Sequence, residues 1–388
     1  MAEARPIAGA FRIPAPDQVL LLTSAVILSV GLVMVASASI TLADKLTGNP
    51  FYYLERQLVF AVAGFVIAAA AYSIPLALWQ RTSFLILLAA LAMLAIVLVP
   101  GIGRHVNGSI RWVVMGPFRV QVSEPARMLI LIYIASYCMR RHAELATRFT
   151  GSLKPMLVVA LAALLLLAEP DFGAAMVLIA TTMAMLFFAG ARLRDFAVFA
   201  ALGLTGFVVL AVASPYRLER ITGFLHPWSH PFDSGFQLTQ SLIAIGRGGF
   251  FGVGLGESVQ KLFYLPEAHT DFLFAVLAEE LGLLGCMLVL SLYFIFTWRC
   301  IAIARQAARK NQMFNAYLAF GLGLWVGLQA FINMGVNMGV LPTKGLTLPL
   351  MSYGGSSLVV VCAAIGLILR VHRETREGRS WQAQQPAA

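Results

Sequence analysis

The chain of 388 residues has little charge: 12% of its residues are Asp, Glu, Lys or Arg, whereas 60% are hydrophobic. A soluble domain usually has about 25% charged and about 45–50% apolar residues. So few charges leave too little polar surface for a soluble fold. They exclude a disordered chain and a soluble nucleic-acid-binding domain, despite the formal net charge of +10. The composition therefore predicts a protein embedded in a lipid bilayer.

Cysteine is also scarce. The four cysteines lie far apart and in or beside apolar runs, at Cys138, Cys286, Cys300 and Cys362. This spacing provides neither a metal-ligand pattern nor a disulfide framework. We interpret the cysteines as packing residues.

Long apolar runs are what the sequence has in abundance. A spanning helix needs about 20 mostly apolar residues, and ten segments meet this condition, three of them with charges near one end. They are residues 18–43, 57–80, 82–103, 120–139, 155–171, 172–191, 196–216, 272–298, 311–343 and 345–369. The runs are too long and too uniformly apolar for the alternating strands of a membrane barrel. We predict an all-α, polytopic membrane protein with about ten transmembrane helices, the first of them retained.

The basic residues indicate the orientation. Ten crossings place both termini on one side, which holds 17 of the 28 basic and six of the 18 acidic residues. The positive-inside rule assigns that side to the cytoplasm. We therefore predict a cytoplasmic tail at 1–17, a transmembrane domain at 18–370 and a cytoplasmic tail at 371–388. The long outside loop, about 214–271, follows the seventh helix and contains a predicted short interfacial helix, Phe236 to Ile245, with Gln237 in it.

Polar residues gather in four clusters on the outward side. They are Asn107–Trp112 with Gln121–Arg127, Glu169–Gly173, Leu265–Phe272, and Asn333 to Ser357. Within them, Ser123 is placed to cap the fourth helix and Asp171 to cap the sixth. Glu124 fits either a helix-dipole partner or a functional carboxylate.

Several charges in or near the apolar segments require partners. Arg127 lies one turn inside its helix, and a cation there normally faces a cavity or a partner. Glu279 and Glu280 would lie within the hydrocarbon layer, and their own helix supplies no partner for them. Lys344 is the only charge between Lys310 and Arg370, which indicates an anionic ligand. Such a site fits a transporter of an anionic solute or lipid, or an enzyme acting on a lipid-linked phosphate. The absence of a convincing internal repeat disfavours the transporter.

These motifs resemble the SEDS family of shape, elongation, division and sporulation proteins (FtsW/RodA/SpoVE). The resemblance covers roughly residues 18–370 and is carried by Gly108–Trp112, Ser123–Pro125, Glu169–Gly173, His269–Phe272, Pro342–Gly345 and Ser352–Ser357. The forms Leu265–His269 and Pro342–Pro349 favour the cell-division branch. Two departures occur: Val122 replaces a proline that is frequent in the family, and Arg127 replaces a lysine.

The resemblance implies a peptidoglycan glycosyltransferase that polymerises lipid II during septal cell-wall synthesis, in the bacterial cytoplasmic (inner) membrane at the division septum. Asp271 matches the family's essential aspartate. A carboxylate at a partly desolvated boundary can act as a base toward the acceptor hydroxyl. The sequence pattern alone favours Asp271 as a cap of its helix beside Thr270, and the resemblance reverses this preference. Asp171 and Asp233 are alternatives for the base or for a metal.

The leaving group would be undecaprenyl pyrophosphate, so cations are expected to bind it. The candidates, in falling order, are Lys344, Arg111, Arg127 and Arg217. The other expected substrate-binding residues are Glu124, Asp171, Gln237, Ser352 and Ser356. A divalent cation, Mg or Mn, is expected on the pyrophosphate.

The resemblance also implies partners: a class B penicillin-binding protein (FtsI) together with FtsQ, FtsL and FtsB. Two other hypotheses stay open from the sequence. One is a lipid II flippase, and the other is a non-catalytic scaffold that recruits the penicillin-binding protein.

Overall fold

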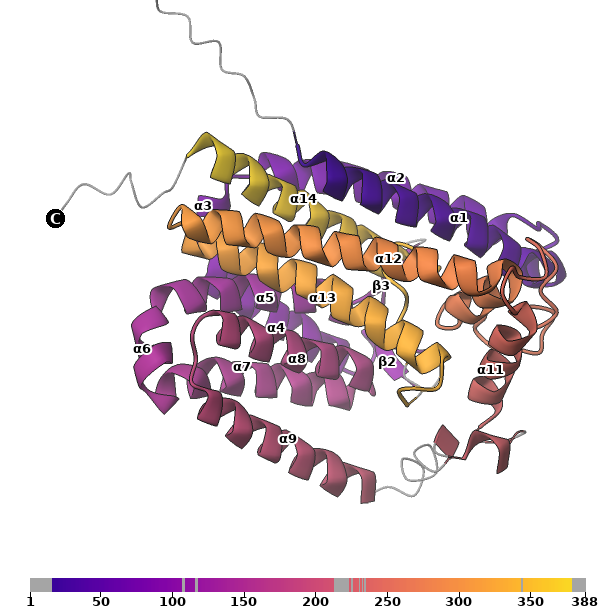
Figure 1. Cartoon of the computed structure of the whole chain (residues 1–388). Helices are drawn as coiled ribbons and strands as arrows, with labels where there is room; N and C mark the ends of the chain where they lie inside the picture. Colours follow the sequence, from indigo (N-terminus) through magenta and orange to yellow (C-terminus); the bar gives the residue numbers. More distant parts are fainter. Residues whose placement is uncertain are drawn as a thin grey trace, which may run out of the picture.

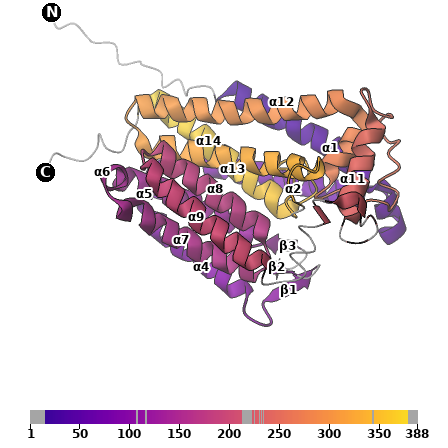
Figure 2. The same ribbon diagram turned by 60° about the horizontal axis from the view of Figure 1, so that its bottom comes forward.

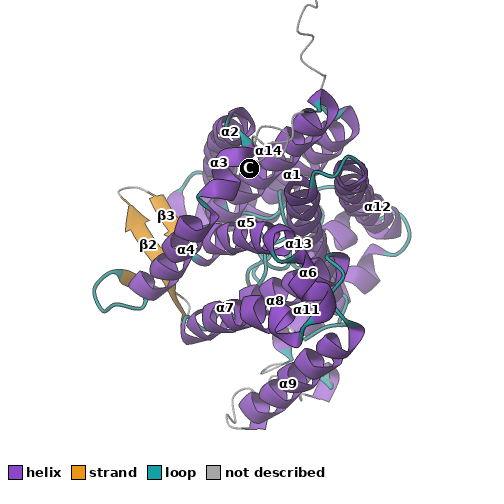
Figure 3. Ribbon diagram, turned by 90° about the vertical axis from the view of Figure 1, so that its left-hand side faces the viewer, coloured by secondary structure: helices purple, strands orange, loops and turns teal. Residues whose placement is uncertain are grey.

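The computed structural model is almost entirely helical, with one small sheet at its edge (Figures 1 and 3). The residues that it describes are 16–106, 109–115, 118–212, 223–224, 226–229, 231, 233, 235–342 and 345–378.

Each of the ten predicted segments contains a long helix. These helices are α1 (Gln18–Thr47), α2 (Tyr52–Ser73), α4 (Ser83–Val97), α5 (Ser123–Arg140), α7 (Phe149–Ala168), α8 (Phe172–Phe188), α9 (Leu193–Val212), α12 (Leu273–Arg309), α13 (Met313–Asn337) and α14 (Gly355–Glu377). Six helices in the described part of the chain are long and apolar enough to cross a membrane: α1, α2, α7, α12, α13 and α14. The helices are confirmed, and the number of crossings stays a prediction.

Short elements connect the long helices. They are α3 (Leu76–Arg81), α6 (His142–Thr147), the 3₁₀ helix η1 (Pro227–Ser229) and α11 (Phe236–Gly248). α11 confirms the short helix predicted in the long loop. α3 and α6 lie at one end of the bundle and α11 lies at the other (Figures 1 and 2).

The bundle is built around its last helix. In the apolar part of α14, 83% of the residues are buried, against 17% in the apolar part of α2. α14 packs against α2, α13, α12 and α5. The end of α14 also returns to the start of α1, where His372 Nδ1 lies 3.7 Å from Asp17 Oδ2. α14 is therefore a central helix, whereas α2 lies at the periphery.

The structure corrects two boundaries. The last segment was predicted as helical from residue 345, but α14 begins at Gly355. The preceding residues form a loop because Leu348 N donates to the side chain of Ser352, 3.0 Å away, and Leu350 has a positive φ of 65°. At its other end, α14 continues to Glu377, seven residues beyond the predicted end of the membrane domain.

The third segment ends in a sheet that the sequence analysis did not predict. α4 ends at Val97 and is followed by the strands β1 (Gly103–Val106), β2 (Ser109–Met115) and β3 (Phe118–Gln121). The strands pair as an antiparallel meander, with Trp112 opposite Gln121. This pairing brings Arg111 of β2 next to the start of α5, where Val122 N donates to the Arg111 carbonyl at 3.2 Å.

Candidate active site

Asp171 is the centre of a polar cluster between three elements. Its Oδ1 accepts from Ala174 N at 3.1 Å, which confirms the predicted cap of α8. Its Oδ2 accepts from Ser123 Oγ at 2.9 Å and from Gln121 Nε2 at 3.2 Å. The guanidinium of Arg111 lies 3.7 Å from the same oxygen. The carboxylate therefore fixes the sheet against α5 and α8.

The prediction that Ser123 caps α5 was wrong. The N-cap residue is Val122, and no side chain makes a capping hydrogen bond there. Ser123 is the first helical residue, and its hydroxyl donates to Asp171 instead, because that buried carboxylate is the stronger acceptor.

Glu124 and Arg127 form a buried ion pair, 4% and 1% exposed, with 2.5 Å between Glu124 Oε1 and Arg127 Nη2. Arg127 Nη1 also donates to Gln329 Oε1 at 3.2 Å. Gln329 Nε2 in turn donates to the Thr347 carbonyl at 3.1 Å. The partner expected for Arg127 is confirmed. The pair links α5 to α13 and to the loop before α14, and direct contact of either residue with a substrate stays a prediction.

Two amides of α13 hold Asp271 through its backbone. Its carbonyl accepts from Asn333 Nδ2 at 2.9 Å and from Asn337 Nδ2 at 3.0 Å. Asn333 also donates to the Leu346 carbonyl, so one amide connects two loops. Asn337 Oδ1 accepts from Ala275 N at 3.2 Å, which satisfies an amide in the first turn of α12.

The Asp271 carboxylate receives no such hydrogen bond from the part of the chain that the structure describes. The N-cap residue of α12 is Phe272, without a side-chain hydrogen bond, so the capping alternative for Asp271 was wrong. Within the described residues no side chain donates a hydrogen bond to this partly buried carboxylate. It faces Gly345, whose ideal Cβ position lies 3.1 Å from Asp271 Oδ2 and 3.9 Å from Arg111 Nη2. Asp271 and Arg111 therefore flank one glycine.

The surroundings of Asp271 raise its pKa to about 7. Burial is the largest cause, and the negative charge of Glu267 adds to it. Arg111 lowers the pKa, whereas Asp171 raises it. A general base is most effective when its pKa lies near the working pH, so this carboxylate is suited to accept a proton near neutrality.

The loop from Gly345 to Gly354 forms another wall of the site. Ser352 is buried; its Oγ accepts from Leu348 N, and its carbonyl accepts from Gln57 Nε2 at 3.0 Å. Ser356, in the first turn of α14, accepts from Gln121 N at 2.9 Å. Both predicted serines thus hold the loop against α2 and β3, and their contact with a substrate stays a prediction.

An aromatic group adjoins Asp271. The ring centroid of His269 lies 4.7 Å from that of Tyr53 and 5.6 Å from that of Tyr353. Tyr353 N also donates to the His269 carbonyl at 3.0 Å. Burial lowers the pKa of His269, which keeps the ring neutral. This aromatic group joins the segment before Asp271 to the loop before α14.

The remaining predicted residues divide into two groups. Gln237 lies in the first turn of α11 and Asp233 lies just before that helix. Neither has a side-chain contact with Asp271 or Asp171 among the described residues. Arg217 and Lys344 lie outside the described residues.

Sequence reasoning assigned no role to the amides of the site. Gln57, Gln121, Gln329, Asn333 and Asn337 each donate to a carbonyl or a carboxylate of the site. For the four amides that lie on helices, the sequence carried a signal, because an amide within an apolar helix needs hydrogen-bond partners. What it could not show was which loops supply them.

Metal ligands do not gather here. No three His, Cys, Asp or Glu side chains in the described ranges are placed to hold an ion. Both oxygens of Asp171 already accept hydrogen bonds from the protein. The donor set does not fit a protein-held metal, and a Mg or Mn ion carried by a pyrophosphate stays a prediction.

Together, a helical bundle with six apolar spans in its described part and a carboxylate near a cation are typical of a membrane protein with a polar site. A model of the FtsW/RodA/SpoVE family, described as "Cell cycle protein", matches residues 17–377. The chain belongs to this family.

Relatives from other bacteria are similar over almost the whole chain. A protein of Thioalkalivibrio sulfidiphilus (strain HL-EbGR7), "Probable peptidoglycan glycosyltransferase FtsW", is 58% identical over 93% of this chain and 90% of its own length. A protein of the same name from Nitrosococcus halophilus (strain Nc4) is 56% identical over 94% of both chains.

Solved structures share the fold. One described as "Structural coordination of polymerization and crosslinking by a peptidoglycan synthase complex" has a TM-score of 0.78 at 30% identity, covering 93% of this chain and 99% of the other. The rod shape determining protein RodA of Thermus thermophilus has a TM-score of 0.69 at 29% identity, covering 93% and 98%.

Proposed function

We propose that this protein is a peptidoglycan glycosyltransferase of the division type, which polymerises lipid II into glycan strands. The observation that carries the proposal is the Asp271 carboxylate, which is held through its backbone by two amides, has a pKa raised to about 7 and faces Gly345 beside Arg111. The names of the relatives support the same activity.

The reaction follows from these groups. Asp271 accepts the proton of the acceptor sugar's 4-hydroxyl as that oxygen forms a bond to the anomeric carbon of the donor. The bond from this carbon to the pyrophosphate breaks, and its electron pair stays on the pyrophosphate. Arg111, and the predicted Lys344 and Arg217, stabilise the negative charge. A single displacement inverts the anomeric centre and needs no covalent intermediate.

The proposed membrane arrangement has ten crossings, cytoplasmic termini and an extracytoplasmic loop between α9 and α12. It is supported by the excess of basic residues on the side of the termini. The start of α1 also adjoins the last turns of α14. The site then opens on the outer face, where lipid II is used.

The proposed partners are a class B penicillin-binding protein (FtsI) with FtsQ, FtsL and FtsB at the division septum. Similarity to a chain of a peptidoglycan synthase complex supports a cooperating synthase.

The decisive experiment mixes the purified protein, its penicillin-binding partner and lipid II in detergent micelles, where sidedness is absent. A polymerase makes glycan chains there, which a gel resolves, whereas a flippase or a scaffold makes none. Asp271→Ala should abolish the product. The matched control is Asp195→Asn, because Asp195 is also buried but accepts from Ser152 Oγ, 2.9 Å away, at the opposite end of the bundle. Full polymer from Asp271→Ala would overturn the assignment.

A further inference from the structure

α12 is 37 residues long and is broken at one glycine. Gly282 has φ 64° and ψ −162°, a conformation that residues with side chains rarely adopt. A Cβ atom there would lie 2.3 Å from Gly252 N and 2.7 Å from the Phe250 carbonyl oxygen. The break divides α12 into a short outer segment, 273–281, which follows Asp271, and a long inner segment, 283–309.

The loop 249–254 satisfies the backbone groups that the break sets free. Val253 N donates to the Glu279 carbonyl at 3.0 Å, and Leu283 N donates to the Gly249 carbonyl at 3.0 Å. Within a membrane such groups must be paired inside the protein. The C-terminal end of the outer segment is therefore hydrogen-bonded to this loop.

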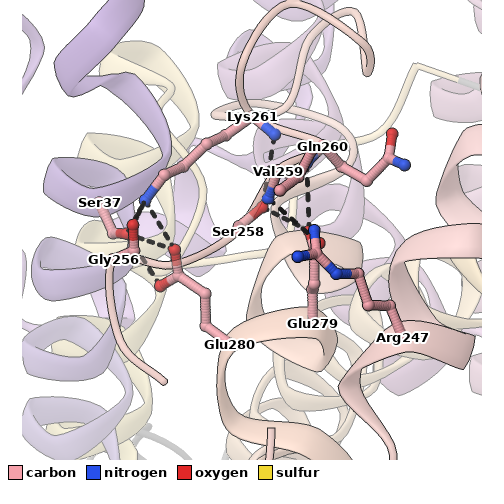
Figure 4. Close-up of polar contacts among 9 residues, drawn as sticks. All are labelled: Ser37, Arg247, Gly256, Ser258, Val259, Gln260, Lys261, Glu279 and Glu280. Carbon is pink, nitrogen blue, oxygen red and sulfur yellow. Dashed lines mark hydrogen bonds and ion pairs between the residues drawn. The ribbon is translucent and has the colours of Figure 1, made fainter. Parts of the chain in front are cut away.

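Two ion pairs strengthen this attachment (Figure 4). In the first, Lys261 Nζ donates to Glu280 Oε1 at 2.9 Å, to Ser37 Oγ at 3.0 Å and to the Gly256 carbonyl at 2.7 Å. The side chains of Lys261 and Glu280 are 4% and 0% exposed. Because Ser37 belongs to α1, this pair connects the outer segment to both the loop and α1.

The second pair connects the outer segment to α11. Arg247 Nη1 donates to Glu279 Oε1 at 3.0 Å. The same carboxylate accepts from Ser258 Oγ and from the backbone nitrogens of Val259 and Gln260, at 3.1 and 3.3 Å. We call the pairs Arg247–Glu279 and Lys261–Glu280 the clamp. Arg247 and Lys261 are thus the partners of the two buried glutamates, which have none within α12 itself among the described residues.

The clamp cannot touch the reacting groups. Glu279 and Glu280 follow Asp271 by eight and nine residues, which is about 12–14 Å along a helix. Asn333 and Asn337 hold the other end of the segment, at the Asp271 carbonyl. The outer segment is thus fixed at both ends, with the carboxylate just before it.

We propose that the four clamp residues are positioning residues, which fix the outer segment of α12 and thereby place the Asp271 carboxylate beside Gly345. The inference deepens the proposed function and rests on it. Because rates depend steeply on the position of a reacting group, loosening the clamp lowers the rate of the chemical step more than it lowers substrate affinity.

The test uses the full chain with its penicillin-binding partner, and kcat and KM for lipid II are measured per mole of folded protein. Glu280→Gln and Lys261→Met should each lower kcat about tenfold, with KM changed less than about threefold. Lys261→Arg, which keeps the cation, should retain about half of kcat. The matched control is Arg299→Met, which breaks the ion pair with Asp17 on the inner segment of the same helix. Its kcat per folded protein should be unchanged.

Amide hydrogen exchange gives a second readout that needs no activity. Peptides covering residues 268–281 should exchange faster in Glu280→Gln than in the wild type, and at the wild-type rate in Arg299→Met. Unchanged exchange together with unchanged kcat in Glu280→Gln would overturn the clamp, and so would an equal loss of kcat in Arg299→Met. If the wild-type protein makes no glycan, the proposed function fails, and the exchange readout alone decides whether the clamp holds the segment.

Discussion

Two aspartates lie just before long helices, and their carboxylates differ in hydrogen bonding. Asp17 caps α1, where it accepts from Leu20 N at 2.9 Å, and it also accepts from Arg299 Nη2 at 2.6 Å. Asp271 precedes α12, but its carboxylate receives no hydrogen bond from the described residues. The carboxylate of Asp17 is paired, whereas the described residues donate to Asp271 only at its main-chain carbonyl.

The opposite pKa shifts express this difference. Burial raises the pKa of Asp17, but the hydrogen bonds from Arg299 and Leu20 overcome it, so the net shift is downward. At Asp271, burial dominates and the pKa rises to about 7. A buried carboxylate can act as a base near neutrality when few hydrogen bonds stabilise its charged form, because its pKa is then raised.

The largest expected effect separates the two aspartates by substitution. Asp271→Asn should lower the polymerisation rate by about 10²–10⁴-fold and leave the melting temperature unchanged or higher. Asp17→Asn should leave the rate per folded protein within about twofold and lower the free energy of unfolding by about 2 kcal/mol, because Arg299 loses its charged partner. Glycan gels and thermal unfolding in the same detergent measure both. A fully active Asp271→Asn protein would show that Asp271, like Asp17, is not required for polymerisation.

The next effect tests the main-chain support of Asp271. Asn337→Leu leaves the Asp271 carbonyl and Ala275 N each without a hydrogen bond that they now have. We expect a loss of about tenfold or more in kcat, because the carboxylate moves with its backbone. Asn315→Leu is the control: Asn315 is a buried amide of the same helix, and it donates to Gln312 instead. Equal losses in both variants would point to general damage to α13.

A smaller effect is expected from one methyl group at Gly345. In Gly345→Ala the added carbon would crowd Asp271 Oδ2 at 3.1 Å, so the carboxylate must shift by a few tenths of an ångström. We expect a severalfold lower kcat and an unchanged melting temperature. Gly246→Ala is the control, because nothing lies within 4 Å of its Cβ position. A fully active Gly345→Ala protein would show that the space beside Asp271 is not used.

Between pH 7 and pH 8 the smallest effect is expected, because it comes from the titration of Asp271 alone. Because Asp271 must be ionised to accept a proton, kcat/KM should fall below about pH 7 with a slope of one. The free energy of unfolding should change in the opposite sense. Between about pH 4 and pH 7, Asp271 binds more protons in the folded protein than in the unfolded chain. Its contribution to stability therefore decreases as pH rises through this window. Asp271→Asn should remove that contribution. A rate that is constant from pH 5 to pH 8 would contradict the assigned base.

Much of the fold could be predicted because bilayer constraints are simple. Apolar runs of about 20 residues located each long helix, and a capping aspartate located the start of α8. The sequence also indicated that Arg127 and the two glutamates of α12 need partners. It could not identify Gln329, Arg247 or Lys261 as those partners, since such contacts depend on which helices become neighbours.

Other features follow from packing that no local pattern contains. The break at Gly282 lies within an apolar run that reads as one continuous helix, and only the approach of the loop 249–254 explains it. Serine is a common helix cap, yet the hydroxyl of Ser123 donates to Asp171, which caps α8. In both places a tertiary contact overrides the local signal.

The central position of α14 has a consequence for how the protein is made. The helix leaves the ribosome after the other long helices of the bundle, yet it fills the middle of the bundle and its Ser356 accepts from Gln121 N of the site. The earlier helices must wait in the membrane with their inner faces uncovered until α14 has been made. A nascent chain that stops before residue 355 therefore already has Asp271 but lacks one wall around it.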